Sequence, residues 1–166
     1  MDYFLRTARL QVREFNFGDA EFIVELVNTD AWLKFIGDRH IKTSQQARDY
    51  LENGPVKSYR DNGFGLWMVE TIDNNIPIGM CGLIKRDNLD HPDIGFAFLP
   101  EFTGKGHGFE IAEAIISYAR QNLFLKTILA ITVPNNIVSI KLIEKLGLKY
   151  LKSFKAENED LLLYSS

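Results

Sequence analysis

The residues best suited to chemistry stand between Leu99 and Ala114, in the run LPEFTGKGHGFEIAEA. Gly104, Gly106 and Gly108 occupy alternate positions in this run, so the backbone can lie close to a ligand without obstruction by a Cβ atom. Apolar residues at helical spacing follow, and a helix presents unpaired N–H groups and the positive end of its dipole at its N-terminus. The pattern predicts a loop that binds phosphate groups, with a diphosphate-bearing cofactor as the first hypothesis.

Two other glycine loops that bind nucleotides fit this chain less well. A nucleoside-triphosphate loop requires Gly-Lys followed by Ser or Thr four residues after its first glycine, and that sequence is absent. A dinucleotide-binding loop normally follows the first strand of a parallel sheet, whereas this loop comes late in the chain. The alternative without a ligand is a flexible turn between a strand and a helix.

Composition limits the class of protein. The chain has 166 residues, of which 46% are hydrophobic and 25% charged, and it has no repeat or linker, so we treat residues 1–166 as one domain. A net charge of −3 argues against broad nucleic-acid binding. The single cysteine, Cys81, excludes an intrachain disulfide and a cysteine metal cluster, and its apolar neighbours predict a buried thiol. We find no signal peptide or membrane span and expect a cytoplasmic protein.

The order of predicted elements is strand, helices, three strands, helix, strand, helix and two strands. Thr43 and Gln46 form a predicted capping box, and Gly147 is placed to end the last helix. Helices packed on a mostly antiparallel sheet predict an α+β fold, a mixed α/β sandwich. The predicted strands are 9–15, 65–71, 76–85, 93–99, 127–133, 150–156 and 161–164. The predicted helices begin at 18, 31, 44 and 139, and a further helix follows the glycine loop and ends near 122.

Three segments together resemble the GNAT N-acetyltransferases, most closely their ribosomal-protein N-terminal acetyltransferase branch. They are TARLQVR at 7–13, IGFAFLPEFTGKGHG at 94–108 and PNNIVSIKLIEKLG at 134–147. The resemblance covers nearly the whole chain. It implies the GNAT fold, in which helices flank a central twisted sheet whose middle strands splay apart.

The resemblance implies acetyl-CoA as the cofactor. Its diphosphate would bind the loop amides, and its pantetheine arm would lie along strand 96–99. Asn136 would bond that arm, although helix capping is its ordinary alternative role. Thr103 departs from the Gln or Arg of the family pattern, and the ring of His107 is expected to face phosphate or solvent. The implied cofactor-binding residues are Phe96, Ala97, Phe98, Leu99, Thr103, Gly104, Lys105, Gly106, His107, Gly108, Asn136 and Ser139.

For the reaction, the resemblance implies direct attack of an amine on the thioester. Ile143 occupies the position of the tyrosine that protonates the leaving thiolate in many relatives, so Ser139 is the candidate acid. Asp93 is a candidate base, with a solvated strand-end charge as its alternative. Asp38 and Arg39 are candidate acceptor-binding residues, Asp38 for an ammonium and Arg39 for a carboxylate or phosphate, with a loop ion pair as the alternative.

The function implied is N-acetylation of a primary amine, either a protein N-terminus or a small amine, by a monomer or homodimer. No nucleic acid, membrane or metal takes part in this interpretation. The missing tyrosine leaves a second interpretation open, a non-catalytic acyl-CoA-binding regulatory domain. The sequence does not select the acceptor, because acceptor choice depends on variable loops and side chains.

Overall fold

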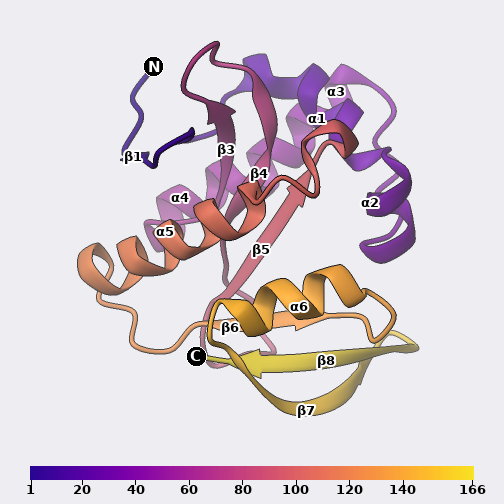
Figure 1. Ribbon diagram of the computed structural model, residues 1–166. Helices are drawn as coiled ribbons and strands as arrows, with labels where there is room; N and C mark the ends of the chain where they lie inside the picture. The colour runs from indigo at the N-terminus through magenta and orange to yellow at the C-terminus, as the bar shows by residue number, and fades with distance from the viewer.

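The computed structural model describes residues 1–166 and is built on one eight-stranded sheet (Figure 1). The strand order is β1-β2-β3-β4-β5-β6-β8-β7, and every neighbouring pair is antiparallel except β5 and β6. The predicted α+β class and the mostly antiparallel sheet are confirmed. The strands are β1 (Leu5–Arg6), β2 (Leu10–Arg13), β3 (Leu66–Thr71), β4 (Pro77–Ile84), β5 (Asp93–Phe98), β6 (Leu129–Thr132), β7 (Lys149–Ala156) and β8 (Glu159–Ser165).

Helices cover both faces of the sheet. The α-helices are α1 (Ala20–Val27), α2 (Asp30–Phe35), α3 (Ser44–Leu51), α4 (Lys57–Asn62), α5 (His107–Asn122) and α6 (Ile137–Lys145). Three short turns of other helix types are η1 (Phe17–Asp19), η2 (Glu52–Val56) and η3 (Pro100–Phe102). None of the helices combines the length and hydrophobicity needed to cross a bilayer.

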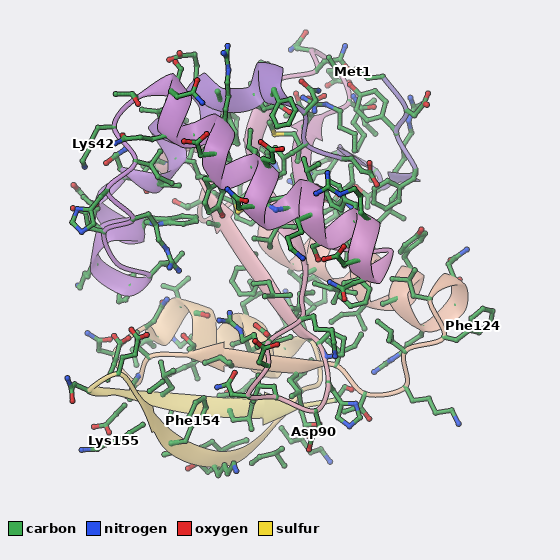
Figure 2. All side chains as sticks on the ribbon, turned by 180° about the vertical axis from the view of Figure 1, so that it is seen from behind. Met1, Lys42, Asp90, Phe124, Phe154 and Lys155 are labelled. Atoms are coloured by element: carbon green, nitrogen blue, oxygen red, sulfur yellow. The ribbon has the colours of Figure 1, made fainter.

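The alternation of side chains along the strands divides the core into two clusters. Trp67, Val69 and Cys81 point to the face covered by α5 and α6, whereas Met68 and Met80 point to the face covered by α1, α2 and α3. Seen from behind, the second helical layer lies over the N-terminal half of the sheet, and the lower strands near the labelled Phe154 carry no helix on that face (Figure 2). The sheet therefore has α6 on only one side of β6, β8 and β7.

Local sequence signals explain most element boundaries. The Thr43 hydroxyl accepts from the Gln46 N–H, and the Gln46 amide oxygen accepts from the Thr43 N–H, so the predicted capping box is confirmed. Gly147 has a φ of 88° directly after α6, as predicted. Helix α6 begins at Ile137, two residues before the predicted start. We did not predict the continuous run α3–η2–α4, in which a π-type turn accommodates Pro55.

The sheet opens between its two parallel strands. β5 and β6 share one register pair, Asp93 with Leu129, and the Leu129 N–H donates to the Pro92 carbonyl at 2.9 Å. Beyond this junction β5 pairs only with β4 and β6 only with β8. In Figure 1, β5 runs diagonally away from the layer formed by β6, β8 and β7. The middle strands therefore splay, as the family resemblance implies.

Candidate functional site

The glycine loop leads directly into α5 and leaves its backbone donors unused. Gly104 and Gly106 have φ values of 71° and 82°, a left-handed conformation that glycine adopts at little cost. The first helical bond of α5 runs from the Glu110 N–H to the Gly106 carbonyl, and the N–H groups from Gly104 to Phe109 donate to no acceptor in the protein. Alternating left- and right-handed residues form a concave row of N–H groups that suits an anion. The loop thus has the geometry predicted for phosphate binding.

The polar side chains of the loop are occupied within it. The Thr103 hydroxyl donates to the Pro100 carbonyl at 2.7 Å, and the Lys105 ammonium lies 5.6 Å from the centre of the Phe102 ring. The His107 ring is largely buried, with Nδ1 3.1 Å from the Phe102 carbonyl oxygen. The expectation that this ring faces phosphate or solvent is therefore wrong, since the ring packs under the loop. Its backbone N–H stays free, so any phosphate contact of His107 comes from the main chain.

A side chain from the other end of the chain reinforces this loop. Arg9, in the turn between β1 and β2, donates from Nη1 to the Lys105 carbonyl at 2.9 Å and from Nε to Glu110 Oε2 at 2.6 Å. The Thr7 hydroxyl donates to Glu110 Oε1, also at 2.6 Å. Sequence reasoning missed the role of Arg9, although this residue lies in the TARLQVR segment, because its contacts cross 96 and 101 residues of the chain.

The strand beside the opening carries the residues predicted to accompany the pantetheine arm. Phe96, Ala97 and Phe98 are half-buried, whereas Leu99 is buried and its N–H donates to the Ile78 carbonyl at 2.8 Å. The edge of β5 that faces away from β4 has no strand partner after Asp93. An unpaired strand edge can take an extended ligand as if it were another strand.

Helix α6 begins close to the start of α5. A Cβ atom added to Gly108 would lie 3.2 Å from Leu142 Cδ2 and 3.5 Å from Phe98 Cε2, so α5, α6 and β5 converge there. The Asn136 amide oxygen accepts from the Ser139 N–H at 3.2 Å, which is the capping role given above as its alternative. The Asn136 NH₂ group and the Ser139 hydroxyl have no protein partner. Both therefore have donors left for a ligand.

The residue at the tyrosine position lies in the core. Ile143 is 1% exposed and packs in the cluster between α5, α6 and the sheet. Ser139 is half-buried and stands one helical turn before Ile143, on the same face of α6. Ser139 therefore offers a hydroxyl on the face of α6 that the absent tyrosine would share.

Asp93 lies at the closed end of the opening. Its side chain is almost fully buried, and its two carboxylate oxygens accept from Arg86 Nε at 2.8 Å and Nη2 at 3.2 Å. Burial raises the pKa of Asp93 above its usual range, and the Arg86 guanidinium opposes that shift. This two-point pairing favours a structural role at the junction of β5 and β6 over the role of a free base.

Asp38 and Arg39 lie exposed in the loop between α2 and α3. Asp38 Oδ1 accepts from the His40 N–H at 2.8 Å, and the pKa of Asp38 is lowered mainly by that bond. Its carboxylate lies within 4 Å of the His40 ring and the Lys42 ammonium rather than of Arg39. Arg39 forms no hydrogen bond or ion pair in the protein, so its guanidinium is free to meet an anionic group.

Comparison with known proteins identifies the family. The family model described as Acetyltransferase (GNAT) domain matches residues 9–149. The chain belongs to the GNAT acetyltransferase family. Among its relatives, the protein named "Uncharacterized N-acetyltransferase YnaD" of Bacillus subtilis is 28% identical over 151 residues, which cover 91% of this chain and 85% of YnaD.

Solved structures of GNAT proteins share the whole fold. A GNAT-family acetyltransferase from Bacillus anthracis superposes with a TM-score of 0.80 at 26% identity, covering 98% of this chain and 96% of that one. The ribosomal L7/L12 α-N-protein acetyltransferase RimL, solved in complex with coenzyme A, gives a TM-score of 0.83 at 14% identity, with 99% and 97% covered. At that identity the likeness to RimL concerns the fold alone.

The one thiol of this GNAT protein lies away from solvent. Cys81 is fully buried in β4, and burial raises its pKa well above that of a free thiol. Because the thiolate is the nucleophile, a buried thiol that stays protonated gives no path through an acetyl-cysteine.

We therefore expect the native protein to resist the thiol reagent DTNB even at about pH 9, where exposed thiols ionise. The raised pKa keeps Cys81 in its thiol form across this range, and burial excludes the reagent. The measurement is absorbance of the released thionitrobenzoate, with protein unfolded in guanidinium as the control that reports one thiol per chain. Rapid labelling of the folded protein would contradict the inert role.

Proposed function

We propose that this GNAT protein moves the acetyl group of acetyl-CoA to a primary amine, by direct attack in a ternary complex. The observation that carries the proposal is the row of unused N–H groups from Gly104 to Phe109, beside the opening between β5 and β6. The row of N–H groups suits a diphosphate, and the opening between the strands suits an extended pantetheine arm. Family membership supports acetyl transfer in general, and we place this activity in the cytoplasm.

Within this proposal, main-chain groups bind most of the cofactor. The N–H groups of Gly104 to Gly108 donate to diphosphate oxygens, and the free edge of Phe96 to Phe98 bonds the pantetheine amides. Leu99 packs beside the arm, since its N–H is bonded to the Ile78 carbonyl. Asn136 contributes its NH₂ group, because its amide oxygen is occupied in capping α6. Thr103 contributes through its backbone, since its hydroxyl is bonded to Pro100.

The bound cofactor supplies an acetyl thioester, whose C–S bond breaks as the amine nitrogen forms a new bond to the carbonyl carbon. A backbone N–H on the free edge of β5 polarises the carbonyl oxygen. The Ser139 hydroxyl gives a proton to the departing sulfur. The amine must lose its own proton, and water at the opening takes it, since Arg86 occupies both oxygens of Asp93.

The acceptor is a protein N-terminus or a small amine. The first class includes the ribosomal protein on which RimL, a protein of the same fold, acts by its title. Asp38 and Arg39 stand on the exposed loop after α2, where we propose that they meet the acceptor. Asp38 would attract an ammonium, and Arg39 would meet a carboxylate.

A turnover screen tests the function directly. Purified protein with acetyl-CoA is offered N-terminal peptides, polyamines, aminoglycosides and amino acids, and released thiol is measured alongside the mass of the products. We expect transfer to at least one class. Tight binding of coenzyme A without transfer to any amine would favour the regulatory alternative, which the buried Ile143 supports by supplying no proton donor.

The diphosphate site predicts the effect of a single substitution. Gly106→Glu should weaken coenzyme A binding by about 100-fold or more, because a carboxylate would repel phosphate and the left-handed backbone disfavours any side chain. Isothermal titration calorimetry measures this affinity. Gly147→Glu is the matched control, since it places the same side chain at a left-handed glycine beyond the far end of α6. Unchanged affinity in Gly106→Glu would refute the placement of the diphosphate.

The acid role predicts a kinetic signature for Ser139. Ser139→Ala should lower kcat by about 100-fold with little change in the KM for acetyl-CoA, because the lost donor acts on the leaving sulfur rather than on binding. Steady-state kinetics with the best acceptor measures both constants. Ser153→Ala on β7 is the control, as its hydroxyl bonds Tyr150. A rise in KM with unchanged kcat would assign Ser139 to binding alone.

A further inference from the structure

The turn between β1 and β2 holds a cation against the phosphate-binding loop. Arg9 contributes its backbone N–H and its Nε to the two oxygens of Glu110, at 3.0 Å and 2.6 Å. Its Nη1 donates to the Lys105 carbonyl at 2.9 Å. One side chain thus joins the middle of the loop to the first turn of α5. The guanidinium is fixed at two points, and the backbone of Arg9 is fixed at a third.

The charge of Glu110 must be neutralised before an anionic ligand can bind at the start of α5. Its carboxylate stands in the first turn of α5, beside the N–H groups that would receive phosphate. Burial would raise the pKa of Glu110, but bonds from Thr7 and Arg9 outweigh burial and lower it, so the group is charged at neutral pH. An unpaired carboxylate there would repel a diphosphate. Arg9 offsets this charge and leaves the positive helix end available.

The remaining nitrogen of Arg9 is unused. Nη2 forms no bond in the protein, and it lies 3.3 Å from the position that a Cβ atom on Gly106 would occupy. The Arg9 side chain is 48% exposed, so a ligand at the loop apex can reach this side chain. The two neighbouring ammonium groups already contact aromatic rings. Lys105 lies over the Phe102 ring, and Lys145 lies over the Phe109 ring at 4.1 Å.

We propose that Arg9 is a cofactor-binding residue whose Nη2 donates to a phosphate oxygen of coenzyme A while its other nitrogens hold the loop in shape. The inference rests on the proposed function and adds a side chain from the N-terminal turn to a site otherwise made of main chain. A guanidinium suits this double task, because its planar fork bonds several acceptors at once. The phosphate is either the diphosphate or the 3′-phosphate.

The test compares four proteins by titration calorimetry with coenzyme A and with 3′-dephospho-coenzyme A. They are wild type, Arg9→Ala, Arg9→Lys and the matched control Arg6→Ala, whose guanidinium lies over the Tyr3 ring instead. Arg9→Ala should weaken coenzyme A binding by about 10- to 100-fold, the loss of a charge-assisted hydrogen bond. The affinity of Arg9→Lys should lie between those of wild type and Arg9→Ala, since lysine keeps the charge but lacks the planar guanidinium. The affinity of Arg6→Ala should equal that of wild type.

Salt dependence separates contact with phosphate from support of the loop. Raising salt from about 0.05 to 0.5 M should weaken wild-type binding more than that of Arg9→Ala, because the variant has lost a screened attraction. If Arg9→Ala loses the same affinity for coenzyme A as for 3′-dephospho-coenzyme A, Arg9 contacts the diphosphate. If it loses affinity for coenzyme A alone, Arg9 contacts the 3′-phosphate. The double variant Arg9→Ala/Glu110→Gln also removes the carboxylate that would lose its partner. It should still bind coenzyme A more weakly than wild type does.

Two results would overturn the proposal. One is an affinity of Arg9→Ala equal to that of Arg6→Ala. The other is a weakened variant whose salt dependence equals that of wild type, which would make Arg9 a support of the loop only. Failure of the wild-type protein to bind coenzyme A is a different result, because it would remove the proposed function itself. Thermal unfolding of each variant checks that the fold is intact.

Discussion

The single pairing of β5 with β6, at Asp93 and Leu129, is the constraint on which the site depends. Both strands run parallel from that junction, and each is followed by a helix on the same face of the sheet, α5 after β5 and α6 after β6. Their helix N-termini must therefore stand together at the open end. The approach of Gly108 to Leu142 fits this geometry. Unpaired strand edges and two helix starts thus border one opening, the usual place for a ligand beyond the carboxyl ends of parallel strands.

Because main-chain groups border this opening, the nearby side chains can bond to the protein itself and stabilise the fold. Thr103 and His107 bond to carbonyls of the η3 turn, and Asn136 caps α6. The buried pair of Asp93 and Arg86 fixes the point where the strands separate. Breaking that pair by removing Arg86 would leave a buried charge without a partner, which is strongly unfavourable. Charged residues near the opening therefore define its shape more than they define its chemistry.

The sequence allowed prediction of what is encoded locally. Glycine spacing identified the loop, the capping box gave the start of α3, and strand alternation gave most of the strands. Contacts between distant segments were outside such reasoning, as with Arg9 and Lys105, or with Asp93, whose pairing to Arg86 needs a folded loop. The helix through η2 was missed for a related reason. Gly54 and Pro55 are local signals for a break, but packing of Pro55 in the interior supports a π-type turn instead.

The buried Ile143 has a consequence for how such a site would accelerate acetyl transfer. Its side chain fills the core beneath α6, so a tyrosine there would need space that the packed interior does not provide. A thiol of the coenzyme A type is a good leaving group, so an acid needs to supply only the lower end of the acceleration that general acids give. The larger part of the rate enhancement must then come from holding amine and thioester in line. A rigid, main-chain-lined opening with Arg9 and Glu110 fastening its loop is suited to that task, and a weak donor such as Ser139 is sufficient beside it.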